Sequence, residues 1–218
     1  MRPRAITFDA FGTLVHHGLE TIEATAAAIA RDHGLPAPAF LEAWQRRYFG
    51  LLRQAPFRTI VEANDLSLRE TAASFGVATD VRPYLQQMME WWREIRPYPE
   101  TAKVLEELGE IPVAVVSNAD HELLLQVLRD GGIPITCVIS SERARSYKPD
   151  GRIFQEALRA LSVPAETVLH LGDSLEADVL GASRAGLRTA WVNRHGLPLT
   201  ATAPDHEMRD LTGLLSLL

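Results

Sequence analysis

The sequence predicts an α/β protein in which a parallel sheet carries an all-helical insertion. Two observations predict this class. Short, continuous runs of Val, Ile and Leu recur along the chain, and stretches with helical periodicity lie between most of them. Runs without polar alternation are typical of strands that are covered on both faces, as in a parallel sheet. Because strand and helix alternate, the expected core is Rossmann-like, with right-handed crossovers and helices on both faces of the sheet.

Five apolar runs are the predicted strands, and each ends in a polar residue. In chain order they read AITFD, PVAVVSN, TCVIS, VLHLGD and TAWVN. The predicted helices of the core read PETAKVLEELG, HELLLQVLRDGG, DGRIFQEALRALS and EADVLGASRAG. Several of them begin near Pro or Asp and end at Gly, as helices commonly do. The last stretch, ATAPDHEMRDLTGLLSLL, is predicted to be a loop followed by a short closing helix.

The segment from residue 16 to residue 96 breaks this alternation. Five helical patterns occupy it, TIEATAAAIARDHG, APAFLEAWQRRYFGLLRQ, FRTIVEAND, SLRETAASFG and RPYLQQMMEWWREIR. Since no strand pattern interrupts them, the segment is predicted to be a second, smaller domain inserted after the first strand. The core domain would then comprise residues 1–15 and 97–218.

The composition excludes several kinds of partner. With 22 Lys and Arg against 28 Asp and Glu, the 218-residue chain has a formal net charge of −6. This charge argues against nucleic acid or an anionic membrane as the main partner. The single cysteine, Cys137, rules out an intramolecular disulfide and fits a reducing compartment. Because no apolar stretch could span a bilayer or act as a signal peptide, we expect a cytoplasmic protein, monomeric or homodimeric.

Polar side chains gather where the predicted strands end. Asp9 closes the first strand, and Asp173 closes the fourth. Ser117 and Asn118 end the second strand. In open parallel sheets, ligands bind beyond the carboxyl ends of the strands. The sequence therefore predicts a small-molecule site at this edge of the sheet.

Four short motifs follow one another along the chain: Asp9 in DAFGTL, Ser117 in VVSNAD, Lys148 in SYKPDGRIF, and Asp173 with Asp178 in GDSLEAD. In this order they resemble the motifs of the haloacid dehalogenase superfamily. Each motif is weak alone, but four in order with strand context make a strong signal. The similarity covers nearly the whole chain. It implies a hydrolase in which residues 16–96 form a helical C1-type cap that closes over the site.

The resemblance implies that Asp9 is the nucleophile and that the reaction passes through a covalent aspartyl intermediate. A carboxylate is a weak nucleophile, but it is ionised at neutral pH and can form an acyl phosphate or an ester. Lys148 is one of only two lysines in the chain. Its ammonium can hold Asp9 and an anionic substrate together. Thr13, Ser117 and Asn118 are the expected phosphate-binding residues, since hydroxyl and amide donors hold phosphoryl oxygens.

A magnesium site is expected beside the nucleophile. Mg²⁺ binds hard oxygen ligands, commonly one or two carboxylates, and Asp173 and Asp178 would provide them. The resemblance implies that the ion bridges Asp9, the backbone carbonyl of Phe11 and Asp173, with Asp178 nearby. The expected cofactor is therefore Mg²⁺.

Phe11 departs from the pattern of the phosphatases in this superfamily. They normally carry an aspartate two residues after the nucleophile, which protonates the leaving alkoxide and then activates water. Phenylalanine can do neither, and such acid–base help contributes roughly 10²–10⁴-fold to a rate. His16 or His17, at the entry to the cap, is the candidate substitute for the acid.

Three functions are consistent with these residues. The sequence favours a Mg²⁺-dependent phosphatase that acts on a small phosphorylated metabolite with a good leaving group. The alternative is a metal-independent 2-haloacid dehalogenase, since halide leaves without a proton and such enzymes carry a tyrosine at the position of Phe11. Arg46, Arg47 and Arg53 of the insertion could then hold the carboxylate of a halogenated acid.

Two residues argue against the dehalogenase. Dehalogenases of the superfamily carry a serine in place of the aspartate in motif IV, whereas this chain keeps Asp173. They also carry a tyrosine where this chain has Phe154. The third function, of another class, is a catalytically impaired scaffold that binds Mg²⁺ or phosphate, with Phe11 as the mark of lost catalysis.

Overall fold

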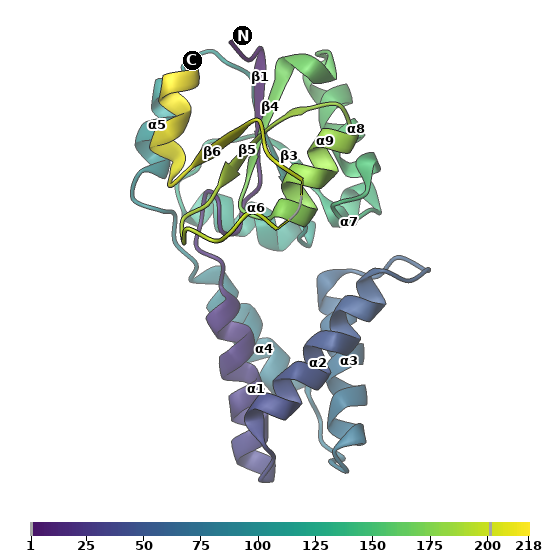
Figure 1. Ribbon diagram of the computed structural model, residues 1–218. Helices are drawn as coiled ribbons and strands as arrows, with labels where there is room; N and C mark the ends of the chain where they lie inside the picture. The colour runs from purple at the N-terminus through teal and green to yellow at the C-terminus, as the bar shows by residue number, and fades with distance from the viewer. Residues whose placement is uncertain (1, 201) are drawn as a thin grey trace. The chain divides into compact units, whose positions relative to one another are not determined.

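One parallel sheet forms the centre of the protein. The computed structural model describes residues 2–200 and 202–218, and within them six strands pair in the order β3-β2-β1-β4-β5-β6 (Figure 1). The strands are β1 (Ala5–Phe8), β2 (Val113–Ser117), β3 (Cys137–Ser140), β4 (Val168–Gly172), β5 (Arg188–Val192) and β6 (His206–Met208). The predicted α/β class with a Rossmann-like core is confirmed.

Strand β1 lies at the point where the order of the strands changes direction. It pairs in parallel with β2 on one side and with β4 on the other, so Ile6 lies opposite both Val113 and Leu169. All four residues of β1 are buried. Because ligands bind in the crevice at such a switch point, beyond the carboxyl ends of the strands, residue 9 lies where the fold favours a site.

Helices cover the sheet in the order that the alternating pattern predicts. They are α5 (Thr101–Glu107), α6 (His121–Asp130), α7 (Ser141–Ala144), α8 (Gly151–Leu161) and α9 (Gly181–Arg184), with the 3₁₀ helices η1 (Ala165–Thr167) and η3 (Leu211–Leu217) and the π-helix η2 (Leu175–Leu180). In Figure 1, α8 and α9 lie on one side of the strands, while α5 lies beside η3 on the other. Ile153 and Phe154 of α8 pack against Val116 of β2 in a fully buried cluster.

Strand β6 differs from the prediction, which placed a loop there. It pairs in parallel with β5, with His206 opposite Ala190. Its three residues, His206–Met208, are mostly polar and form the edge of the sheet. An edge strand this short and charged lacks the apolar run by which buried strands are recognised.

The helices of the insertion form a compact unit of their own. The chain forms two compact units, a helical unit, Gly18–Ile95, and a core unit, which runs up to His17 and resumes at Arg96–Leu218. The helical unit consists of α1 (Leu19–His33), α2 (Ala37–Leu52), α3 (Ile60–Ser74) and α4 (Arg82–Arg93). That this unit acts as a cap remains a prediction. Within the described segments, no helix is both long and apolar enough to cross a bilayer.

Helix α3 joins two patterns that the sequence suggested were separate helices. Its N-terminus is fixed by Thr59, whose hydroxyl accepts from the N–H of Glu62 while the Glu62 carboxylate accepts from the N–H of Thr59. This capping box stabilises the start of the helix. The polar residues Asn64 and Ser67 then bond to carbonyls of the same helix instead of ending it.

Candidate active site

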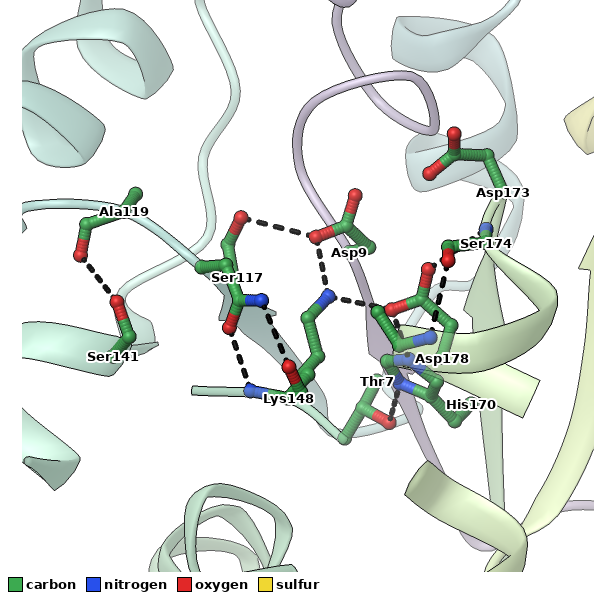
Figure 2. A network of polar contacts seen from close by, with 12 residues as sticks. Thr7, Asp9, Ser117, Ala119, Ser141, Lys148, His170, Asp173, Ser174 and Asp178 are labelled. Carbon is green, nitrogen blue, oxygen red and sulfur yellow. Dashed lines mark hydrogen bonds and ion pairs between the residues drawn. The ribbon is translucent and has the colours of Figure 1, made fainter. Parts of the chain in front are cut away.

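The residues of the four motifs meet at the carboxyl ends of β1, β2 and β4 (Figure 2). Asp9 directly follows β1, and Ser117 is the last residue of β2. Asp173 directly follows β4. The loop between α7 and α8 brings in Lys148.

Asp9 is held by one of its two carboxylate oxygens. Oδ1 accepts hydrogen bonds from Ser117 Oγ at 3.0 Å and from Lys148 Nζ at 2.6 Å. Figure 2 shows the other oxygen, Oδ2, pointing away from both donors, and it bonds to no other residue that the structure describes. Burial raises the pKa of Asp9, and the contacts with Lys148 and Ser117 oppose that rise. The carboxylate is thus anchored through Oδ1, and Oδ2 carries none of these hydrogen bonds.

Lys148 bridges two buried carboxylates. Besides Asp9, its Nζ donates to Asp178 Oδ1 at 2.5 Å, and its side chain is only 2% exposed. Burial alone would lower the pKa of Lys148, but the neighbouring Asp178 and Asp9 outweigh it and hold the pKa above its usual range. Lys148 therefore remains an ammonium ion at the centre of the site.

Asp178 is fixed on both of its oxygens. His170 Nε2 lies 3.2 Å from Oδ1, and the backbone N–H of Ser174 donates to Oδ2 at 3.0 Å. Burial would raise the pKa of Asp178, but Lys148 and His170 outweigh it and lower the pKa. The other ring nitrogen of His170, Nδ1, lies 2.9 Å from Thr7 Oγ1. An ionised Asp178 can only accept, so Nε2 donates, and in the neutral ring Nδ1 accepts from the Thr7 hydroxyl.

Asp173 is the most accessible of the three carboxylates. Its side chain is 22% exposed, and its Oδ2 lies 3.3 Å from His17 Nε2. Burial, followed by the charges of Asp9 and Asp178, raises the pKa of Asp173 to about 8. Gly12 lies against this pair with φ of 89°, and a Cβ there would come within 2.7 Å of Asp173 Oδ2. Both the positive φ and the close approach require glycine.

Of the predicted phosphate-binding residues, one is buried and another is already hydrogen-bonded to the backbone. The Thr13 side chain is completely buried, and its hydroxyl has no hydrogen-bond partner among the described residues. Asn118 uses its amide on the backbone of Lys148, donating from Nδ2 to the carbonyl at 3.2 Å and accepting from the N–H at 2.7 Å. Asn118 thereby braces Lys148. Phe11 is partly exposed and offers no proton.

The three arginines considered for carboxylate binding belong to α2 and its end. Arg46 forms an exposed ion pair with Glu42 at 2.6 Å. Arg47 donates to the carbonyl of Ala43, and Arg53 is the exposed C-cap residue of the helix.

Sequence analysis missed two residues that support the site. Trp191 of β5 donates from its indole Nε1 to the carbonyl of Asp173 at 2.8 Å. Arg194, two residues beyond β5, donates to the carbonyls of Gly12 and Thr13. Neither lies in a motif. The one available signal was their place at the carboxyl end of a predicted strand.

Comparison with known proteins identifies the family. The family of haloacid dehalogenase-like hydrolases matches residues 3–186. The chain is 32% identical to (S)-2-haloacid dehalogenase H-109 of Pseudomonas putida, over 97% of this chain and 96% of that protein. It is 29% identical to (S)-2-haloacid dehalogenase 4A of Burkholderia cepacia, over 95% and 88%. The solved structure of L-2-haloacid dehalogenase PA0810 superimposes with a TM-score of 0.76 and 30% identity, over 98% and 97%.

These similarities overturn two predictions. The phosphatase is wrong, because the similar proteins are 2-haloacid dehalogenases. The magnesium cofactor is wrong for the same reason, since such dehalogenases work without a metal. Oxygens of Asp9, Asp173 and Asp178 do lie within 4.8 Å of one another, the pattern that suggested the ion. However, Lys148 already supplies the positive charge between two of them. The chain is a hydrolase, and it belongs to the haloacid dehalogenase-like hydrolase family.

Proposed function

We propose that this hydrolase is a 2-haloacid dehalogenase, which replaces the halogen at C2 of a small 2-haloalkanoate by a hydroxyl group. The observation that carries the proposal is the hydrogen bonding of the Asp9 carboxylate. Lys148 and Ser117 hold its Oδ1, Oδ2 bonds to nothing that the structure describes, and the residue two places on is Phe11. The names of the similar proteins support the substrate class.

The first half-reaction needs a nucleophile and no acid. Asp9 Oδ2 attacks C2 from the side opposite the halogen, the C2–halogen bond breaks with its electron pair on the halide, and an ester forms on Asp9. Halide is a stable anion, so the absence of an acid at Phe11 costs nothing. Attack from the opposite side inverts C2, and an (S)-haloacid therefore gives an (R)-hydroxy acid.

The second half-reaction hydrolyses the ester. Water attacks the carboxyl carbon of Asp9, and negative charge develops on the oxygen that remained carbonyl-like, Oδ1. Ser117 and Lys148 already donate to that oxygen, so they form an oxyanion hole. The bond between the carboxyl carbon and the substrate oxygen then breaks. One proton of the water ends on the hydroxy acid and the other goes to solvent, while Asp9 recovers an oxygen from water.

Asp173 takes the place of a serine in this scheme. With its pKa raised to about 8, the carboxyl group is mostly protonated at neutral pH. It can then donate a hydrogen bond as a serine hydroxyl does, and it adds little repulsion toward an anionic substrate.

Halide release tests the proposal. The purified protein is incubated with each enantiomer of 2-chloropropanoate, with EDTA in one series and Mg²⁺ in another, and chloride and lactate are measured. The proposal predicts chloride and (R)-lactate from the (S)-enantiomer at equal rates in both series. Absence of chloride from both enantiomers, with Asp9→Asn as the matched blank, would refute it.

A further inference from the structure

Side chains from distant parts of the sequence hydrogen-bond to the loop that begins at Asp9. We call residues 9–15 the nucleophile loop. Two of its consecutive carbonyls, those of Gly12 and Thr13, accept from Arg194 through Nε at 3.2 Å and Nη2 at 2.8 Å. The next carbonyl, that of Leu14, accepts from Thr101 Oγ1 at 2.7 Å and from a backbone N–H at 3.1 Å. Three successive peptide units are therefore fixed by groups far along the chain.

Each of the three guanidinium nitrogens of Arg194 already has a partner within the protein. Its third nitrogen, Nη1, pairs with Glu100 Oε1 at 2.7 Å, and Cζ lies 3.5 Å from the centroid of the Tyr98 ring. The side chain is only 12% exposed. A guanidinium ion that is stacked, paired and hydrogen-bonded on all three nitrogens is rigid, because each contact restricts the same planar group.

The fixed peptide units are hydrogen-bonded to the residue that follows Asp9. The N–H groups of Thr13, Leu14 and Val15 all point to the carbonyl of Ala10, at 3.3, 2.9 and 3.0 Å. Ala10 is joined to Asp9, whose own N–H donates to Leu171 of β4 at 2.8 Å. The first two of these peptide units are therefore held between Arg194 on one side and the residue after the nucleophile on the other.

We propose that Arg194 is a positioning residue for the dehalogenase reaction. It fixes the nucleophile loop so that Asp9 Oδ2 is aligned with the carbon–halogen bond. The inference rests on the proposed function. Because Arg194 does not contact substrate, its loss lowers kcat and leaves KM nearly unchanged. A displacement of the nucleophile by about 1 Å costs on the order of 10²-fold in rate.

Two variants and one control test this role. Arg194→Gln removes the charge and most of the donors, and Arg194→Lys keeps the charge opposite Glu100 but cannot bond to both carbonyls. Arg188→Gln is the matched control, since Arg188 is a partly buried arginine of β5 that bonds to His206 instead. We expect kcat to fall roughly 10–100-fold in Arg194→Gln and less in Arg194→Lys, with KM within about threefold of the parent value. Arg188→Gln keeps the parent kcat.

Hydrogen exchange provides a readout that does not depend on activity. In the folded Arg194 variants, amides in a peptide that covers residues 5–15 should exchange on the order of 10-fold faster than in the parent, and those of Arg188→Gln should not. Parent-like kcat or parent-like exchange in Arg194→Gln would overturn the inference, as would a loss confined to KM. If the parent protein itself releases no halide, the proposed function fails, and the exchange result still decides whether Arg194 holds the loop.

Discussion

Lys148 and Asp9 form a buried ion pair across the site, with Nζ 2.6 Å from Oδ1 and side chains only 2% and 8% exposed. They come from distant parts of the chain, the loop before α8 and the end of β1. The pair orients the carboxylate, and in the proposed reaction it leaves Oδ2 as the attacking oxygen. Since Asp178 contacts the same ammonium, Lys148 compensates two negative charges at once.

Replacing Lys148 by Met should therefore reduce both stability and activity. Two buried carboxylates would lose their shared cation, which destabilises folded proteins by roughly 3–5 kcal/mol. Loss of a donor to Oδ1 should lower kcat for halide release by at least about 10²-fold. Urea denaturation and steady-state kinetics measure the two effects. Lys103→Met, at an exposed position of α5, is the control and should change neither.

The hydrogen bond between Thr7 and His170 should stabilise the position of Asp178. Thr7→Val removes the hydroxyl while keeping the shape, and we expect a loss of about 1–2 kcal/mol in the free energy of unfolding. His170→Leu should cost more, because Asp178 loses a donor as well. A double-mutant cycle measures the coupling of Thr7 and His170. Additive losses would mean that the 2.9 Å contact contributes nothing.

Phe11 gives a test of leaving-group chemistry. Phe11→Tyr should retain halide release within about threefold, since neither side chain is needed as an acid. Phe11→Asp should lower halide release by at least about 10-fold, because it adds a negative charge beside Asp9 and an anionic substrate. Faster halide release in Phe11→Asp would show that the step depends on a proton.

Asp173 should make stability depend on pH. Its pKa is raised from 3.8 to about 8 in the folded state, so the folded protein holds this proton more tightly than the unfolded chain does. The resulting stability is fully present below about pH 4, declines as pH rises, and is lost above about pH 8. Asp173→Asn cannot ionise. Its stability relative to the parent should therefore increase between pH 5 and pH 8 and then level off, as measured by thermal unfolding. A constant difference would contradict the raised pKa.

The position of the site could be predicted because it depends on a rule about parallel sheets. Asp9, Ser117 and Asp173 each end or follow an apolar run, and the carboxyl ends of parallel strands share one edge. Strand β6 and the single helix α3 could not be predicted in the same way. The first is decided by edge pairing of a polar segment, and the second by side chains such as Asn64 bonding within the helix.

The chemistry was harder to predict than the position. Asp9, Ser117 and Lys148 serve an acyl phosphate and an ester equally well, so they do not separate a phosphatase from a dehalogenase. In the sequence alone, Phe11 favours the dehalogenase, whereas the carboxylates of Asp173 and Asp178 favour a magnesium site. The contacts that change the interpretation of these carboxylates are formed only on folding, so the sequence alone does not reveal them. Lys148 pairs with Asp178, His170 contacts the same carboxylate oxygen, and burial raises the pKa of Asp173.

The most direct test of the proposed mechanism is a single turnover of (S)-2-chloropropanoate in ¹⁸O-water with the protein in excess. The ester route predicts that the lactate formed carries ordinary oxygen, taken from Asp9, and that the peptide containing Asp9 gains the heavy isotope. Both are measured by mass spectrometry, with Asp9→Asn as the control. Heavy oxygen in the lactate of the first turnover, with an unlabelled Asp9 peptide, would mean that water attacks C2 directly and would contradict the assignment of Asp9 as the nucleophile.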